Sequence, residues 1–173
     1  IWLSLKAVYD DKQQLAYYVG TFSDLTQVKK SEAKAVFLEN FDAVTELPNR
    51  YQLKEFLHGY MTNEATYNQP YSIMRINIDR FKTLSDSLGE HDTEVLLRAV
   101  AKRLVEFAPD ALLVSRLSDD NFILVFSSTQ GNVHDYLQKY ADALLISFNN
   151  PIVIDKLKLV ITLSIGLALY PEH

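Results

Sequence analysis

The order of hydrophobic and polar positions predicts a β-hairpin at the start of the chain. Apolar residues occupy every second position from Leu3 to Tyr9, and a second apolar run covers residues 15–22, beyond the polar segment 10–13. Two such runs on either side of a polar turn indicate a pair of antiparallel strands. A two-stranded hairpin is only marginally stable alone in water, so we expect this one to pack on the rest of the chain or on a partner.

A helix is predicted directly after the hairpin. Ser23 and Asp24 form a helix-capping signal, and apolar residues then recur at helical spacing from Leu25 to Leu38. The other flank of this segment carries several lysine and glutamate residues, which suits an exposed connection. We therefore predict a linker helix over residues 25–40.

From residue 50 onward, helical and strand patterns interleave with short loops. The predicted elements are, in order, a helix after Pro48-Asn49, a strand at 71–78, a short helix ending at Gly89, a longer helix ending at Pro109, strands at 111–117 and 122–126, a helix at 133–148, and two final strands around the Asp155-Lys156 turn. This interleaving predicts an α/β (α+β) layered domain with a mixed sheet and helices on both faces.

Composition and charge exclude several classes of protein. The 173 residues suffice for about one domain with an appendage, and 48% apolar residues allow a real core. With 17 Lys and Arg against 22 Asp and Glu, the net charge of -5 makes nucleic acid an unexpected partner. The absence of cysteine excludes disulfides and thiolate sites, and it is compatible with a reducing compartment, so we expect a cytoplasmic location.

The two ends of the sequence indicate a piece of a longer protein. No apolar run approaches the roughly 18 residues of a membrane span, so no membrane segment is expected here. The start has no secretory signal, and because the numbering opens at an Ile we expect the chain to be part of a longer protein.

Four blocks of residues carry more specific information than the hydrophobic pattern. They are Phe41 to Arg50, Ile76 to Gly89, Arg116 to Phe122 and Thr162 to Ala168. In this order and spacing they resemble the GGDEF family, the diguanylate cyclase domains of bacterial signalling. The resemblance covers roughly residues 41–173 and implies a nucleotidyl-cyclase, palm-like sheet flanked by helices.

A shorter resemblance covers the N-terminal part. Trp2, Tyr18 to Thr21 and Asp24 to Thr26 resemble the last two strands and exit motif of a PAS sensor domain. Together the two resemblances imply the C-terminal hairpin of a PAS-like domain at 1–24, the linker helix at 25–40, and a GGDEF domain at 41–173 that stops before the family's last helix.

The GGDEF resemblance implies a reaction in which two GTP molecules condense to cyclic di-GMP at the interface of a dimer. Carboxylates hold divalent Mg²⁺ or Mn²⁺ ions that neutralise the phosphates and activate the hydroxyl nucleophile. In this chain the first metal-binding acid falls on Asn77. The signature loop reads Ser118-Asp119-Asp120-Asn121-Phe122, so one acid survives as Asp120, the next is Asn121, and both glycines are lost.

These departures predict a weakened catalytic site. An amide in place of a carboxylate removes a full negative charge from a hard-cation site. Asp119, which replaces a glycine, adds an anion and a Cβ where the backbone should approach the triphosphate. In an unrelated protein the same residues would be an ordinary hairpin turn.

The nucleotide contacts implied by the resemblance are altered in part. The guanine-binding positions fall on Ser85 and Glu94, while Lys82 matches a phosphate-contacting lysine. Lys82 could equally be a solvated helix residue. The family's inhibitory RxxD motif would span Pro109 to Leu112 and is absent.

Asp79 has two interpretations. It lies two residues after Asn77 and so on the same strand face, where it could join Asp119 and Asp120 in a substitute cation site. Alternatively, it caps a helix that begins at Arg80, which we favour because Asp is a preferred capping residue.

The resemblance to the GGDEF family, together with these departures from it, implies three alternative functions. The first is a catalytically degenerate GGDEF domain that acts as a regulatory or dimerisation module, with a homodimer through the hairpin or linker helix and a downstream EAL phosphodiesterase. The second is a weak diguanylate cyclase. The third is a module that binds GTP without turnover through Lys82, Ser85 and Glu94.

Overall fold

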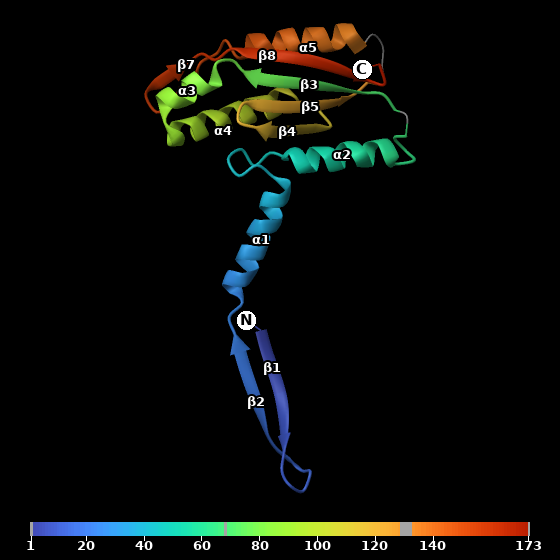
Figure 1. Cartoon of the computed structure of the whole chain (residues 1–173), viewed down its shortest axis with the longest axis vertical. Helices are drawn as coiled ribbons and strands as arrows, with labels where there is room; N and C mark the ends of the chain where they lie inside the picture. Colours follow the sequence, from blue (N-terminus) through green and yellow to red (C-terminus); the bar gives the residue numbers. More distant parts are fainter. Residues whose placement is uncertain (1, 68, 129–132, 173) are drawn as a thin grey trace. The chain divides into compact units, whose positions relative to one another are not determined.

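The computed structural model describes residues 2–67, 69–128 and 133–172. It divides the chain into two compact units, residues 1–39 and residues 40–173 (Figure 1). None of the helices among the described residues combines the length and apolar character needed to span a bilayer.

The first unit is a hairpin followed by a helix, as predicted. Its elements are β1 (Trp2–Tyr9), β2 (Leu15–Ser23) and α1 (Thr26–Asn40). The turn is closed by the Asp10 carboxylate, which accepts a 2.8 Å hydrogen bond from the backbone N–H of Gln14. Asp24, just before the helix, accepts a hydrogen bond from the N–H of Thr26, the first helical residue, at 2.9 Å.

This unit buries few side chains of its own. Every β2 residue before Ser23 is exposed, and α1 has no buried residue. The exposed side chains include Leu5, Tyr18 and Phe22, the last with 73% of its surface accessible. Exposed apolar side chains gathered on one hairpin are typical of a surface that contacts a partner.

The second unit contains the interleaved helices and strands. Its elements are α2 (Arg50–Thr62), β3 (Tyr71–Ile78), α3 (Phe81–Leu88), α4 (Glu90–Phe107), β4 (Leu113–Ser118), β5 (Asn121–Ser127), α5 (Val133–Ser147), β6 (Ile152–Ile154), β7 (Leu157–Leu159) and β8 (Leu163–Tyr170). One sheet has the order β4-β5-β3-β8, which Figure 1 shows from bottom to top, and β6 and β7 form a separate pair.

The layered fold is confirmed, and two details differ from the prediction. All pairings in the four-stranded sheet are antiparallel, so the expected mixed strand directions are not found. The last region holds three strands instead of two, because the chain leaves the β6–β7 hairpin at 160–162 and joins the main sheet at Leu163. The apolar run continues through this break, since Ile161 is buried in the core, and the pattern therefore shows no boundary.

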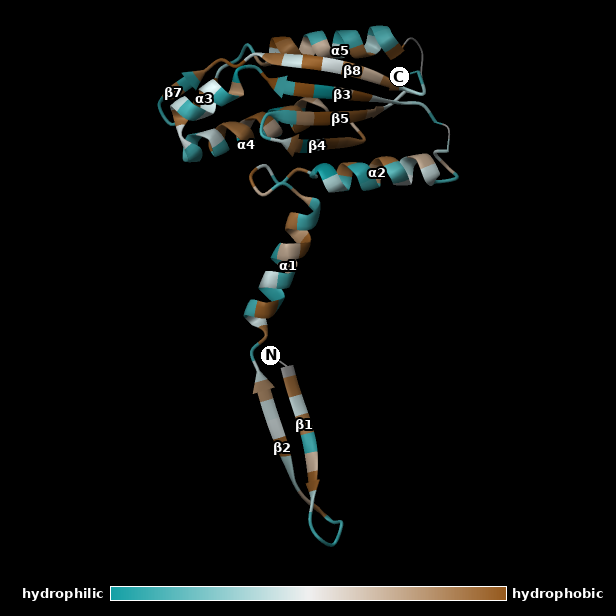
Figure 2. Ribbon diagram, viewed as in Figure 1, coloured by the Kyte–Doolittle hydropathy of each residue, from teal (hydrophilic) through white to brown (hydrophobic). Residues whose placement is uncertain are grey.

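Each face of the sheet has its own apolar layer. On one face Met74, Ile76 and Ile78 of β3 pack with α4 and α5, and the buried side chains include Leu96, Leu104 and Leu144. On the other face, a smaller cluster around Leu53 of α2 covers Tyr71, Ile123 and Val125. In Figure 2 the hydrophobic colours gather on β4, β5 and β8, as expected for strands covered by helices.

Capping side chains and residues with positive φ mark where the helices of this unit begin. Asn49 caps α2, and its side chain accepts hydrogen bonds from the N–H groups of Tyr51 and Gln52. Gly89 has a φ of 77° between α3 and α4, a conformation that glycine adopts without steric cost. Arg80, at the start of α3, has a φ of 54° although it is not glycine.

Candidate functional site

The signature residues form the tip of the β4–β5 hairpin. β4 ends at Ser118 and β5 begins at its partner Asn121, so only Asp119 and Asp120 lie in the turn. The predicted four-residue turn at 118–121 is therefore shorter, because Ser118 and Asn121 pair across the strands. The pairing shifts register between Arg116 and Ser118.

The end of β3 lies beside this turn. Asn77 pairs with Asn121 on one side and with Ser164 of β8 on the other. The backbone N–H of Ile78 also donates to the carbonyl of Asp120 at 3.2 Å. The two positions that match the family's metal-binding acids, Asn77 and Asp120, are thus brought together from sites 43 residues apart in the chain.

The Asp120 carboxylate is surrounded by amide donors. Nδ2 of Asn77 donates to Oδ2 of Asp120 at 3.3 Å, and Nδ2 of Asn121 donates to Oδ1 at 3.0 Å. Nδ2 of Asn121 also contacts Oγ of Ser118 at 3.3 Å. Both carboxylate oxygens therefore have partners from the protein itself.

Arg75 completes this cluster, although it is not among the site residues predicted from the sequence. Its Nε and Nη2 donate to Oδ1 of Asn121 at 2.9 and 2.6 Å. Arg75 lies two residues before Asn77 and hence on the same face of β3. The signal was present in the sequence, because Arg75 is the one charged residue inside the apolar run 71–78.

An ion pair between buried Arg116 and partly buried Asp42 supports the signature turn. Nη1 of Arg116 contacts Oδ1 of Asp42 at 2.8 Å, and Nη2 donates to the carbonyl of Asp119 at 2.8 Å. The backbone N–H of Arg116 donates to the carbonyl of Pro48. Arg116 therefore joins the loop at 41–49 to the signature turn. From the sequence, Arg116 was identified only as the first residue of a family block, with no predicted role.

Asp79 does not cap the following helix, so that interpretation is wrong. α3 begins at Phe81 with Arg80 as its N-cap, and no side chain caps it. Instead, Oδ1 of Asp79 accepts a 2.6 Å hydrogen bond from Oγ of Ser164. This hydrogen bond, assisted by one from Thr162, holds the pKa of Asp79 below its ordinary value. Cross-strand pairing thus outweighs the local capping preference.

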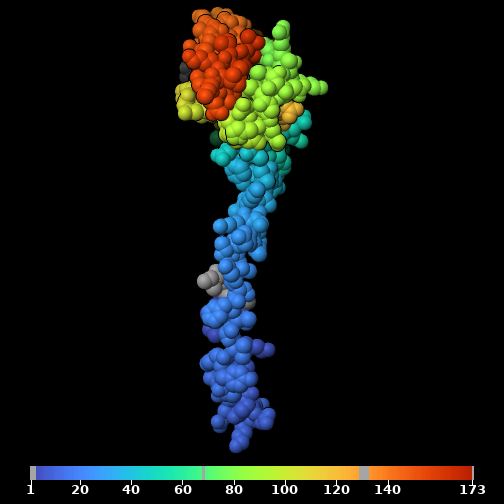
Figure 3. All heavy atoms as spheres, turned by 90° about the vertical axis from the view of Figure 1, so that its left-hand side faces the viewer, coloured from blue at the N-terminus to red at the C-terminus, as the bar shows by residue number. Residues whose placement is uncertain are grey.

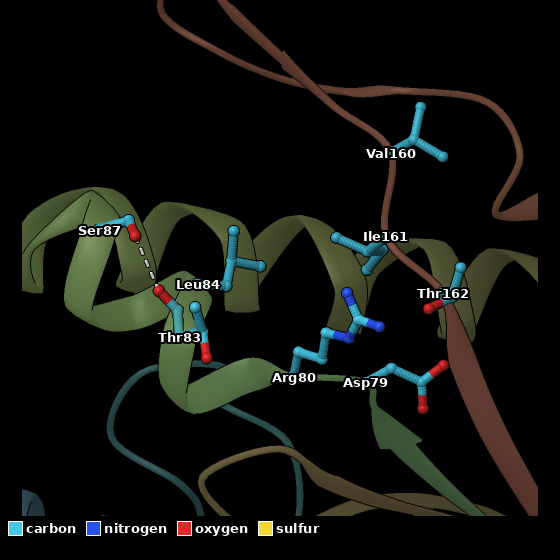
Figure 4. Close-up of a pocket in the computed structure, with 8 residues that line it drawn as sticks. All are labelled: Asp79, Arg80, Thr83, Leu84, Ser87, Val160, Ile161 and Thr162. Carbon is cyan, nitrogen blue, oxygen red and sulfur yellow. Dashed lines mark hydrogen bonds between the residues drawn. The ribbon is translucent and has the colours of Figure 1, made fainter.

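A shallow pocket of about 620 Å³ lies beside Asp79. It is lined by one flank of α3 and by the segment 160–162, and Figure 4 shows the Asp79 side chain directed toward Thr162, just before β8. In Figure 3 the yellow-green surface of α3 and α4 adjoins the red surface of the segments leading into β8. The positions expected to contact the nucleotide, Lys82 and Ser85, are not part of the pocket lining.

The expected guanine-binding positions have partners within the protein. Oγ of Ser85 donates to the carbonyl of Lys82 at 2.9 Å. Glu94 forms an ion pair with Arg98 at 3.0 Å, one turn later in α4. Lys82 itself is exposed on α3.

Residues 39–173 match the family model described as "Diguanylate cyclase, GGDEF domain". The chain belongs to the GGDEF family. This membership confirms the resemblance drawn from the four blocks and places the chain among the domains of bacterial cyclic di-GMP signalling.

Curated proteins with similar sequences carry names from bacterial signalling. The chain is 28% identical over 149 residues to "Signaling protein YkoW" of Bacillus subtilis and 29% identical over 148 residues to "Cyclic di-GMP phosphodiesterase NbdA" of Pseudomonas aeruginosa. Each match covers 86% of this chain, but the chain spans only 18% of the length of either relative.

Solved structures show the same fold. The GGDEF domain of TpbB from Pseudomonas aeruginosa is 30% identical, with a TM-score of 0.67 and 77% of each chain covered. A "sensory box/GGDEF family protein" from Caulobacter crescentus is 27% identical, with a TM-score of 0.67, and covers 77% of this chain and 85% of its own.

The residues of this GGDEF domain do not fit the divalent metal centre that the family implies. A hard cation needs oxygen ligands, and carboxylates provide most of the affinity. Here two amide N–H groups face the one remaining acid, Asp120. Among residues 2–67, 69–128 and 133–172, no three His, Asp or Glu side chains are grouped so that they could hold a metal ion. Asp79, Asp119 and Asp120 therefore do not form the substitute site considered above.

Proposed function

We propose that this GGDEF domain is catalytically degenerate and acts as a regulatory module within a larger cyclic di-GMP signalling protein. The observation that carries the proposal is the state of Asp120, whose two carboxylate oxygens accept hydrogen bonds from the amides of Asn77 and Asn121. Transfer of a nucleotidyl group needs charge neutralisation at the phosphates. This arrangement supplies no group of carboxylates to hold the cations that would provide it.

The loop chemistry supports the same proposal. Asp119 is exposed at the tip of the turn, so its carboxylate adds negative charge where the family accommodates a triphosphate. Removal of one group that stabilises transition-state charge costs on the order of a hundredfold in rate, and here the changes are several.

An assay of cyclic di-GMP formation tests this proposal directly. The purified protein is incubated with GTP and either Mg²⁺ or Mn²⁺, with the GGDEF domain of the relative named diguanylate cyclase TpbB as the positive control. We expect no product above background. Product formation that disappears in the Asp120→Ala variant would show instead that the domain is a weak cyclase, whereas product that persists in this variant would indicate contamination.

GTP binding without turnover is the second candidate. It is favoured by the exposed ammonium group of Lys82 on α3, next to Ser85 and near the helix that carries Glu94. Calorimetric titration of GTP with Mg²⁺ into the protein measures this binding. Saturable binding that is weakened by Lys82→Ala but not by Lys139→Ala, at an exposed position on α5, would support it.

The neighbouring parts of the protein are proposed from the relatives and from the first unit. The name of NbdA describes a cyclic di-GMP phosphodiesterase, which supports an EAL phosphodiesterase as the target of regulation. The "sensory box" in the name of the Caulobacter protein supports a PAS-like sensor of which residues 1–24 are the end, with 25–40 as the linker and 41–173 as the GGDEF domain. We further propose a cytoplasmic location and a homodimer formed through the hairpin or the linker helix.

A further inference from the structure

The cluster around Asp120 contains one feature that the loss of carboxylates alone does not explain. In a metal site that had only lost its acids, water molecules alone could provide the hydrogen bonds that the Asp120 carboxylate needs. Instead, a continuous chain of hydrogen bonds runs from the guanidinium of Arg75 through the amide of Asn121 to Asp120. The positive charge of Arg75 therefore lies beside Asn121, on the same face of β3 as Asn77.

The orientation of the Asn121 amide follows from its partners. A guanidinium can only donate hydrogen bonds, so the group that faces Arg75 must be the Oδ1 acceptor. The NH₂ group of Asn121 then necessarily faces the acceptor oxygens of Asp120 and Ser118, as observed. A glutamate at this position could still accept from Arg75 but could not donate to Asp120, so the two neighbouring carboxylates would repel each other.

Asn77 completes the arrangement from the opposite side. Its Nδ2 donates to the second oxygen of Asp120 because an ionised carboxylate accepts but does not donate. The unit Arg75, Asn121, Asp120 and Asn77 therefore has one positive and one negative charge joined by amides. Hydrogen bonds in such a chain polarise one another and strengthen cooperatively.

We propose that Arg75 replaces the divalent cation of the family's site, so that the signature turn is held and its charge balanced without any metal ion. To bind Mg²⁺ or Mn²⁺, Asn121 would have to release Arg75 and rotate its oxygen toward the cation, and Asn77 would have to rotate as well. The cation would then lie near a guanidinium. Asp79 offers no compensation because its carboxylate is held by Ser164.

The proposal predicts how metal binding depends on Arg75. The first measurement is the binding of Mn²⁺ to the wild-type protein, followed by the electron paramagnetic resonance signal of free Mn²⁺. No saturable binding is expected at millimolar Mn²⁺. Saturable binding that is lost in the Asp120→Asn variant would overturn the proposal.

The second measurement restores the acids. In the double variant Asn77→Asp, Asn121→Glu, additional replacement Arg75→Met should tighten Mn²⁺ binding by at least about tenfold, since a cation no longer repels the metal. Lys139→Met in the same background removes an equal charge from an exposed position on α5 and should change nothing. Equal Mn²⁺ affinity with Arg75→Met and Lys139→Met would contradict the proposal.

Two controls keep these results interpretable. Circular dichroism and thermal unfolding show whether each variant is folded, and the wild-type titration tests the proposal even if the restored variants do not fold. The outcome is also separate from the proposed function. Mn²⁺ binding at Asp120 without formation of cyclic di-GMP would overturn the role of Arg75 and leave the proposal of a non-catalytic domain intact.

Discussion

Three hydrogen bonds converge on Oδ1 of Asp42, a residue well away from the predicted catalytic positions in the sequence. They come from the backbone and side chain of Thr45 and from Arg116. Burial opposes ionisation of Asp42, but the bonds from Thr45 and Arg116 outweigh it, and the pKa of this carboxyl is lowered below its ordinary value. The charge of Asp42 therefore stabilises the folded state.

The Asp42→Asn variant should be less stable than the wild type at neutral pH by about 3 kcal/mol, the lower end of the range for broken buried ion pairs. The lower end applies because Asp42 keeps 24% of its side chain accessible, against 7% for Arg116. A lowered folded-state pKa stabilises above the ordinary pKa of Asp, about 4. The difference should therefore shrink as pH falls through the lower pKa of the folded state.

Urea unfolding of both proteins at neutral and acidic pH measures this difference. Glu55→Gln, at an exposed position on α2, is the control and should show no comparable change. A destabilisation by Asp42→Asn that remains the same at every pH would show that the charge of Asp42 is not its cause.

At the scale of elements, α2 covers the smaller apolar layer that lies on the same side of the sheet as Arg75 and Asn77. Only Leu53 of this helix is buried, so packing contributes less here than in α4, which buries five residues. Short helices with little buried surface depend more on their caps. Asn49 provides that cap by accepting from two backbone N–H groups.

Asn49→Ala should destabilise the protein by about 1 kcal/mol, the usual effect of losing an N-cap side chain. The measurement is the free energy of unfolding in urea. Glu55→Ala, in the middle of the same helix, should stay within about 0.5 kcal/mol of the wild type. If both substitutions have the same effect, general helix propensity rather than capping determines the stability of α2.

At the scale of the whole molecule, the two units differ in how they are stabilised. The unit 40–173 contains both apolar layers, whereas the unit 1–39 has exposed strands and a helix without buried residues. Folding of the larger unit should therefore be independent of the smaller one. The exposed apolar side chains of the hairpin, among them Phe22, are instead available to a partner.

A protein consisting of residues 40–173 should unfold within about 2 °C of the full chain, because the described buried residues of both apolar layers lie within 40–173. If the hairpin or linker helix mediates the proposed homodimer, light scattering should show a monomer for 40–173 and a dimer for the full chain. Phe22→Ser in the full chain should shift the equilibrium toward the monomer. A dimer of unchanged affinity in 40–173 would place the interface elsewhere.

Much of the local structure could be predicted from neighbouring residues. The strand at 71–78 agrees with β3 to the residue, and the Asn49 signal and Gly89 mark the boundaries at which helices begin or end. Four blocks of residues were sufficient to predict membership of the GGDEF family. The break at 160–162 could not be predicted because a continuous apolar run gives no sign of where the chain changes sheets.

The sequence predicted which residues form the site but not which side chains contact each other there. The sequence alone showed that Asn77 and Asn121 stand where acids are expected and that Asp120 remains, because residue identity and spacing are sufficient for that. Only the tertiary structure showed that Arg75 binds Asn121 and that Ser164 binds Asp79. Those contacts depend on the register between β3, β5 and β8, which is set by the burial of alternate residues across strands far apart in the chain.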